Sequence, residues 1–499
     1  MDRVGVRGRV LISTVSQVAV NAITAVLAIV VLRIVTKHLG PHKYGQLVTV
    51  LTFVTLCTVV TDLGLNGITI RNVARFPERA EEIISDNLSA RGLLCLLAVP
   101  LMGAAAFLIY PTERGTVALG ITVMAIDVLF GAVSATCMIW YAARIRNEVA
   151  ALIALLNRLI YTAAVIAAAV SGASLFGYIG ATLLADGATA SLSLLLVRRR
   201  VRVRPRFRPR TWRANMAGSF SLGLMQIVGT VFLWIDSFLI SLYLGPKDVA
   251  FYGIAFTIIV LVNSFSSNFM GSLLPTLSRS SPEDIPIVLE RAFYAMLVIG
   301  LPIAAAGVLL RHEIIELVAG SRYLDSTAPL AILLSSIVFT FLNNVYGYAC
   351  VAFSRVRVLV WVQVPAVALN VVLNLMLIPR YGIDAAAAAT LVTEVLSFIT
   401  TTMIFRARMR IRMSLRPAWK PALSTVVMVA AALAASSLWD TESAVANIIL
   451  SASLLGVVYA LSLIIVKGVP TDIAILGHQV SRRAVVMVNQ LLHRGNGDE

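Results

Sequence analysis

The side chains most able to do chemistry in this sequence are ionisable groups embedded in long apolar stretches. A charged group in such surroundings is costly, so it usually faces a cavity or pairs with a partner. Some lie near the middle of a stretch and others nearer an end: Asp127, Arg158, Asp186 and Glu394, and then Asp236 and Arg33. These positions are therefore the first candidates for binding or ion coupling.

Arg158 is the best candidate for a cation that holds an anionic ligand. A guanidinium binds phosphate through two parallel hydrogen bonds and stays charged at physiological pH. The alternative is that Arg158 pairs with Asp186 on a neighbouring helix and serves only packing. Arg33 lies one turn before Lys37. Its long side chain can reach the outer headgroups, which is the alternative to a role in binding.

Three carboxylates are candidates for ion coupling. Asp186 and Glu394 end two similar segments, ATLLAD and ATLVTE. The charged form of a carboxylate is disfavoured in a low-dielectric site, so such a group can bind and release protons near neutral pH. Hydrogen bonding between helices is the alternative role for this pair. Asp127 has no matched partner and is the third candidate.

The apolar stretches predict an all-α polytopic membrane protein. Of the 499 residues, 59% are hydrophobic and only 13% are charged, whereas soluble domains carry roughly 25% charged residues. A spanning helix needs about 20 mainly apolar residues. About fourteen segments meet this length, roughly at 11–36, 46–68, 90–110, 116–140, 149–170, 175–197, 215–243, 249–272, 291–310, 327–350, 357–378, 383–405, 418–438 and 444–466.

The basic residues predict the orientation of these spans. The net charge is +16, and Arg and Lys gather in alternate loops, most densely from Arg198 to Arg213 and from Arg406 to Lys420. Cytoplasmic loops retain basic residues, so both termini are predicted to be cytoplasmic. The Ala-rich, Arg-over-Lys composition suggests a bacterium with a GC-rich genome, so the inner membrane of a bacterium is the expected location. Nucleic-acid binding would need a basic face on a soluble module, which this pattern does not provide.

The sequence divides into two similar halves. LGPHKYG (Leu39–Gly45) leads into the second span, and LGPKDVAFYG (Leu244–Gly253) leads into the eighth. These segments and the ATLLAD and ATLVTE pair predict two related six-helix lobes, which is a transporter pattern. We expect an N-terminal lobe at 1–213 and a C-terminal lobe at 214–412. Two further spans at 413–466 and a cytoplasmic tail at 467–499 follow.

The arginine-rich joint at the end of the first lobe, RRRVRVRPRFRPRTWR, has two interpretations. Its prolines oppose a helix there. It is either a solvated linker on the positive, cytoplasmic side or a site for anionic lipids.

No motif for a cofactor is found. The sequence has no G-x-x-x-x-G-K-[ST] phosphate loop, and no histidine or cysteine cluster has metal-ligand spacing. The cysteines lie inside apolar spans and are expected to be small core residues: Cys57, Cys95, Cys137 and Cys350. We therefore expect neither a metal nor an organic cofactor, and no catalysis.

Several motifs along the chain resemble the polysaccharide-exporter branch of the multidrug/oligosaccharidyl-lipid/polysaccharide (MOP) flippase superfamily, which includes the Wzx-type O-antigen flippases. The matching segments are KHLGPHKYG, TDLGLNGITIRNVAR, WIDSFLISLYLGPKDVAFYGIAF, AGSRYLDSTAPLAILL and LIPRYGIDAAAAATLVTE. In this order they are typical of that branch. Lys37 departs from it, because the family often has Arg at this position.

The resemblance implies a flippase that carries a polyprenyl-diphosphate-linked oligosaccharide to the outer leaflet by alternating access, driven by a proton or sodium gradient. Arg158 and Arg33 would then meet the substrate. Asn370 and Asn374 share a helix face and could line a cavity for the sugar headgroup, with interhelical hydrogen bonding as the alternative. Asp236, in the WID motif, is expected to be a structural or gating residue.

Three other functions are compatible with the sequence. A flippase for the peptidoglycan lipid precursor would share the architecture. A drug/cation antiporter of the same superfamily would favour a net acidic cavity and normally twelve spans, and Arg158 argues against it. A membrane-embedded glycosyltransferase is the third, although the longest outer loop, near Arg311–Ser326, is too short for an external domain. Expected partners are the lipid-linked oligosaccharide, the bilayer and a polysaccharide polymerase or assembly protein.

Overall fold

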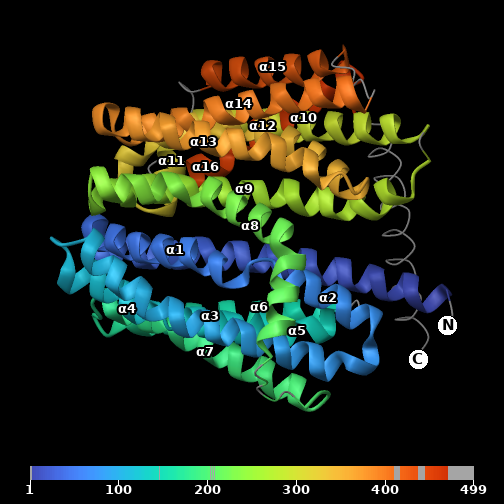
Figure 1. Cartoon of the computed structure of the whole chain (residues 1–499). Helices are drawn as coiled ribbons and strands as arrows, with labels where there is room; N and C mark the ends of the chain where they lie inside the picture. Colours follow the sequence, from blue (N-terminus) through green and yellow to red (C-terminus); the bar gives the residue numbers. More distant parts are fainter. Residues whose placement is uncertain are drawn as a thin grey trace, which may run out of the picture. The chain divides into compact units, whose positions relative to one another are not determined.

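The computed structural model describes residues 3–144, 146–202, 204, 206, 208–281, 283–409, 416–435 and 444–469. The described chain is helical and contains no strand, as predicted. The predicted cytoplasmic tail lies outside the described residues, apart from its first three positions. Figure 1 shows the helices coloured along the sequence.

Each predicted span coincides with a helix. In the N-terminal half these are α1 (Arg3–Asp62), α3 (Ala80–Ile109), α4 (Leu119–Met124) with α5 (Asp127–Ala142), α6 (Asn147–Val170) and α7 (Leu175–Arg198). The short α2 (Leu65–Arg75) precedes α3. The later helices are α8 (Pro209–Tyr243), α9 (Pro246–Arg279), α10 (Ile285–Leu309), α11 (Arg311–Val318), α12 (Thr327–Ala352), α13 (Val356–Tyr381), α14 (Ile383–Arg408), α15 (Trp419–Ala435) and α16 (Ala444–Ile465).

Twelve segments of the described chain are helices long and apolar enough to cross a membrane. One of these segments lies in α1, which contains the first two predicted spans, and α16 supplies a shorter apolar segment. Within α1 the backbone departs from helical geometry at Gly40, where φ is 69°. Glycine adopts this left-handed conformation without steric cost, and Pro41 has no N–H to continue the preceding helix. The Gly-Pro pair therefore separates the two spans.

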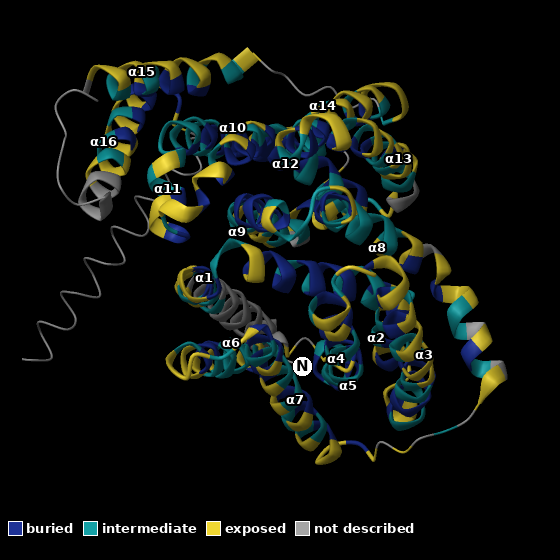
Figure 2. Ribbon diagram, turned by 90° about the vertical axis from the view of Figure 1, so that its left-hand side faces the viewer, coloured by how far each residue is buried: buried dark blue, intermediate teal, exposed yellow. Residues whose placement is uncertain are grey.

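Large apolar side chains lie exposed along the helices. Leu101 and Leu108 of α3 are 70% and 82% exposed, and Val170 at the end of α6 is 85% exposed. Exposed residues run along much of the length of the helices in Figure 2. Such extensive exposed apolar surface is unfavourable in water, whereas lipid solvates it. Helices also satisfy their own backbone hydrogen-bonding groups in lipid. The protein is therefore a multi-pass membrane protein.

The helices pack into two compact units. The first unit comprises 1–268, 311–333 and 355–397, and the second comprises 269–310, 334–354 and 398–499. In the first unit, α6 packs against α1 and α7, α5 packs against α7, and α8 packs against α1 and α13. In the second unit, α15 packs against α16 and α10. These two units differ in their bounds from the predicted repeats at 1–213 and 214–412. The repeats remain a prediction.

The arginine-rich joint is anchored on α3. The backbone N–H groups of Arg204 and Arg206 donate to the hydroxyls of Ser85 and Ser89, at 3.2 and 2.8 Å. Arg208 forms an ion pair with Glu82, and Val201 and Trp212 are buried. The described part of the joint is thus held against the N-terminal turns of α3 rather than being fully solvated. Arg199 and Arg202 are exposed. The interpretation of the joint as a site for anionic lipids stays a prediction.

Candidate functional site

A mainly apolar cavity with one polar wall lies between α5, α6 and α7 in the first unit. Its volume is about 380 Å³. The apolar part of the wall includes Phe130 and Met138 of α5. The polar part is formed by Ser134, Asn157, Asp186 and Thr189. These polar side chains come from three helices, so tertiary packing brings the predicted Asp186 into a site with neighbours that no single motif contains.

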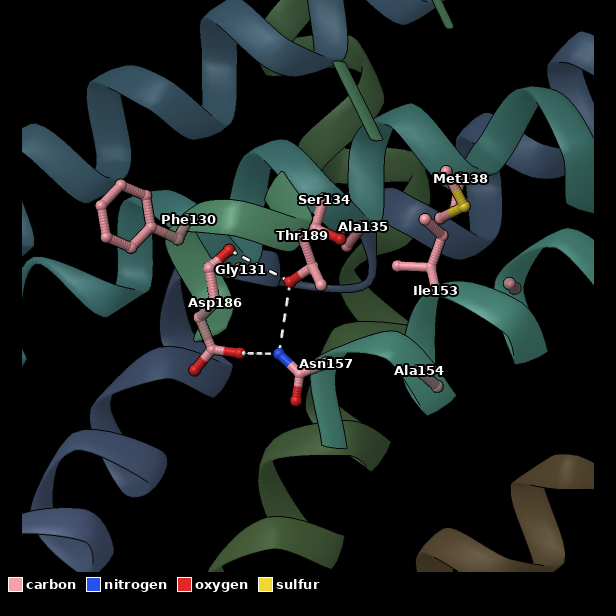
Figure 3. Close-up of a pocket in the computed structure, with 11 residues that line it drawn as sticks. Phe130, Gly131, Ser134, Ala135, Met138, Ile153, Ala154, Asn157, Asp186 and Thr189 are labelled. Carbon is pink, nitrogen blue, oxygen red and sulfur yellow. Dashed lines mark hydrogen bonds between the residues drawn. The ribbon is translucent and has the colours of Figure 1, made fainter. Parts of the chain in front are cut away.

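Asn157, Asp186 and Thr189 point toward one another in the cavity (Figure 3). The Asn157 side-chain amide donates to Asp186 Oδ1 at 2.6 Å and to the Thr189 hydroxyl at 3.2 Å. Thr189 in turn donates to the backbone carbonyl of Ala185 at 2.8 Å, one turn earlier. The short bond fixes one face of a half-buried carboxylate whose surroundings remain open to the cavity.

Asp127 lies beside this group. It is the first residue of α5, directly after the break between α4 and α5, and its carboxyl is close enough to Asp186 for the two to interact. Asp127 Oδ1 is buried and has no hydrogen-bond partner. Two adjacent carboxylates repel unless a proton or cation lies between them. The structure therefore brings together two of the three predicted coupling residues.

Arg158 follows Asn157 on α6 but has different contacts. Its guanidinium carbon lies 5.5 Å from the centre of the Tyr161 ring, which is a cation–π distance. Arg158 Nε is buried and has no hydrogen-bond partner. Among the ion pairs of the described residues, none joins Arg158 to Asp186. The packing alternative for Arg158 thus lacks its expected partner, because Asn157 bonds to Asp186 instead.

Arg33 lies on the exposed surface of α1 and caps a neighbouring helix. Its Nη1 donates to the backbone carbonyl of Glu316 in α11 at 2.8 Å. A carbonyl in the last turn of a helix lacks an intrahelical donor, and a cation is favoured there. Arg33 therefore ties α1 to α11 in this structure.

Asp236 of α8 is enclosed by polar side chains from three other helices. It is 2% exposed. Tyr252 of α9 donates to Oδ2 at 2.7 Å, Thr390 of α14 to Oδ2 at 2.6 Å, and Asn374 of α13 to Oδ1 at 2.6 Å. Asn374 also donates to Asn370 Oδ1 at 3.0 Å. The predicted amide pair is fully buried and faces Asp236.

Two polar atoms of this cluster have no hydrogen-bond partner, namely Asn370 Nδ2 and Asn374 Oδ1. Glu394 lies one turn after Thr390 in α14 and is 7% exposed. The third predicted coupling residue therefore lies in the same helix as part of the Asp236 cluster, in contrast to Asp186 beside its cavity.

Sequence reasoning missed a buried ion pair between the interior of α3 and the end of α1. Arg91 Nε lies 3.7 Å from Asp62 Oδ1, and the side chains are only 4% and 8% exposed. Arg91 also donates to Asn66 Oδ1 at 2.9 Å. The third span was predicted to begin at residue 90, which placed Arg91 at its edge, but α3 begins ten residues earlier. An acidic residue in TDLG was the available signal for a buried partner.

Two solved membrane transporters have a fold similar to that of this chain. A lipid II flippase MurJ in an inward closed conformation superposes with a TM-score of 0.79 at 12% identity, covering 89% of this chain and 97% of that one. An inward-facing multidrug resistance MATE transporter of the MOP superfamily gives 0.60 at 14% identity, covering 80% and 98%. The fold is therefore that of the MurJ- and MATE-like helical transporters.

The sequence comparisons define the family. Residues 10–281 match the model of the polysaccharide biosynthesis protein family, and residues 222–376 match that of the MatE family. The first match covers more than half of the chain, so the protein belongs to the polysaccharide biosynthesis protein family, within the MOP flippase superfamily. The resemblance found in the sequence is confirmed.

A curated relative is also a flippase by name. The probable low-salt glycan biosynthesis flippase Agl15 of Haloferax volcanii is 24% identical over 183 residues. The match covers 36% of this chain and 38% of that protein. The chain thus matches well under half the length of this relative.

Proposed function

We propose that the protein moves a polyprenyl-diphosphate-linked oligosaccharide from the cytoplasmic to the outer leaflet of a bacterial inner membrane by alternating access. The observation that carries this proposal is Arg158, a mid-span guanidinium whose buried Nε has no hydrogen-bond partner. A buried charge needs compensation, and a diphosphate supplies acceptors in the geometry that a guanidinium prefers. Membership of the polysaccharide biosynthesis family supports the class of substrate.

Ion coupling is proposed at Asp186 and Asp127. The two carboxyls interact, and Asp186 lies in the polar wall of a cavity of about 380 Å³ that is large enough for a hydrated cation or several waters. A proton or a sodium ion would offset the charge that the two carboxylates share. Glu394, at the matching repeat position, is a further candidate in the C-terminal half. Both termini are expected to be cytoplasmic, and a polysaccharide polymerase or assembly protein would receive the product outside.

The experiment compares Arg158→Lys with Arg158→Gln in proteoliposomes or in a complemented deletion strain, with equal amounts of inserted protein. Lysine keeps the charge but loses the paired hydrogen bonds, so part of the transport of lipid-linked oligosaccharide should remain, whereas glutamine should abolish it. Leu159→Ala on the exposed side of α6 is the matched control and should transport normally. Full activity of Arg158→Gln would remove the basis of the proposal.

A peptidoglycan-precursor flippase is the main rival, because the MurJ likeness concerns the fold and not the cargo. The two functions differ in which lipid-linked sugar accumulates on the cytoplasmic side when the protein is missing. Loss of a drug/cation antiporter would cause neither of these lipid-linked sugars to accumulate.

A further inference from the structure

The two repeat-related LGP motifs meet in space. Each contains a glycine with left-handed backbone, Gly40 with φ +69° and Gly245 with φ +126°, directly before a proline. The first motif turns between the two spans of α1, and the second turns from α8 into α9. By the predicted orientation, both turns lie at the outer end of the membrane.

The contact between the motifs involves the closing glycine of each. A Cβ atom on Gly45 would fall 1.5 Å from the carbonyl oxygen of Pro246, so only glycine fits there. A Cβ atom on Gly253 would fall 3.1 Å from Val48 Cγ1, which is a tight contact with the helix that follows the first motif. Each motif thus ends in a glycine that packs against the other half of the repeat.

Aromatic rings close over this contact. Tyr44 precedes Gly45 and packs edge-on against Tyr323, with ring centres 6.1 Å apart. Phe251 of the second motif packs edge-on against the same ring at 6.2 Å. Tyr323 is 1% exposed, and its hydroxyl donates to the backbone carbonyl of Thr36 at 3.0 Å. The α11–α12 segment therefore buttresses both motifs through one ring.

The second motif also reaches the Asp236 cluster. Tyr252, the residue before Gly253, donates its hydroxyl to Asp236 at 2.7 Å. Separation of the motifs would move the α9 backbone that carries this tyrosine. The contact is consequently placed to couple the outer end of the transporter to a buried carboxylate.

We propose that the Gly45–Pro246 and Gly253–Val48 contacts, sealed by Tyr44, Tyr323 and Phe251, form the outer gate, which must separate to release the headgroup outside. This inference rests on the proposed alternating-access function. Backbone-to-backbone contact leaves no room for a sugar, so transport requires that the two motifs part. Substitutions that fix them together should stop transport without altering the substrate site.

A disulfide between the two motifs would hold the gate closed. The Cβ positions of Val48 and Gly253 are 3.8 Å apart, which is the usual Cβ separation of about 3.8 Å in a disulfide. The variant Val48→Cys/Gly253→Cys, in a background without the four native cysteines, should therefore form a disulfide on oxidation. The matched control is Gly103→Cys/Thr122→Cys, because its Cβ separation is also 3.8 Å but it joins α3 to α4 within the predicted N-terminal lobe.

Two measurements distinguish a failure of the proposed gate from a failure of the proposed function. The first is transport of lipid-linked oligosaccharide before and after oxidation, with disulfide formation measured by mass spectrometry. The second uses no substrate: a Thr52→Cys reporter, one turn after Val48 on the same helix, 1% exposed and outside the proposed seal, is added to each pair, and a membrane-impermeant maleimide is applied from the outside. Opening of the gate should make the buried reporter react. The single variants Val48→Cys and Gly253→Cys control for effects of the substitutions themselves.

We expect the oxidised Val48→Cys/Gly253→Cys protein to lose transport and reporter labelling, and a reductant to restore both, while the oxidised control pair keeps both. Transport and labelling that persist in the cross-linked protein would overturn the gate. Failure of this pair to cross-link while the control pair does so would also overturn it. Absence of transport from the reduced proteins, with labelling still blocked by the cross-link, would refute the proposed cargo and leave the gate standing.

Discussion

Asp186 and Asp236 are both acidic residues inside apolar helices, yet their surroundings differ in kind. Asp236 is 2% exposed and accepts hydrogen bonds from three neutral side chains on three different helices. Asp186 is half-buried at the edge of a cavity and has a short bond from Asn157 and a second carboxyl nearby. An enclosed, saturated carboxylate is suited to holding helices together. A carboxylate beside a cavity is suited to exchanging an ion.

The largest effect is expected from Asp236→Ala. Tyr252 and the partly buried Thr390 would lose their acceptor, while Asn374 would keep only its bond to Asn370. Each group left unsatisfied costs about 1–3 kcal/mol. The variant should therefore unfold at a much lower temperature in detergent, as measured by tryptophan fluorescence or size-exclusion chromatography. Asp186→Ala is the matched control and should lose far less, because water in the cavity can solvate Asn157. Equal losses would mean that the two sites do not differ as described.

Next in size is the neutral double variant Arg158→Met/Asp186→Asn. If the two residues only balanced each other's charge, replacing both would leave transport nearly intact. The geometry predicts loss of transport instead, because Asp186 bonds to Asn157 and the guanidinium is available for the substrate. Transport is measured with insertion confirmed by membrane fractionation. Full export by the double variant would end the substrate role of Arg158.

A more selective effect is expected from Asp186→Asn. The amide oxygen can still accept the bond from Asn157, so the site should keep its shape while losing its charge. Transport driven by an imposed proton or sodium gradient should then fall to the rate without a gradient, and substrate binding should remain measurable. Asp236→Asn provides the comparison. If a well-folded Asp236→Asn protein lost gradient dependence while Asp186→Asn kept it, coupling would belong to the enclosed site.

The smallest effect is expected from Arg33→Gln. The substitution removes one hydrogen bond on an exposed surface, which is worth about 1 kcal/mol or less of stability. Arg91→Gln is the informative contrast, since breaking a buried ion pair costs about 3–5 kcal/mol. Thermal unfolding of the two variants measures both. A severe loss of transport in a stable Arg33→Gln protein would instead indicate contact with the substrate.

The helices could be predicted from the sequence because spanning segments are defined by length and apolar content alone. The Asp186 site could be predicted only in part. The sequence identifies Asp127 and Asp186 as charges near the middle of their spans, but nothing in either segment indicates that the two residues meet. Asn157 lies beside Arg158 and looks like an ordinary polar neighbour until α6 is packed against α7, which turns the amide toward Asp186.

The Asp236 cluster could also be predicted only in part. Asn370 and Asn374 were predicted to share a helix face, which holds, since Asn374 bonds to Asn370 one turn earlier. Which element that face meets depends on the packing of α8 against α13. The Arg91–Asp62 pair escapes prediction because the expected start of the span lies ten residues after the start of α3, which moves Arg91 from the inside of the helix to its end.

A polyprenyl-diphosphate-linked oligosaccharide, the proposed cargo, should accumulate when the protein is missing. The most direct measurement is mass spectrometry of the lipid-linked sugars in a strain that lacks the protein. Treatment of intact spheroplasts with a membrane-impermeant reagent then determines the leaflet in which each lipid resides. We expect accumulation of a polyprenyl-diphosphate oligosaccharide on the cytoplasmic leaflet, relieved by the wild-type gene and not by Arg158→Gln. Accumulation of the peptidoglycan precursor, or of no lipid-linked sugar, would contradict it.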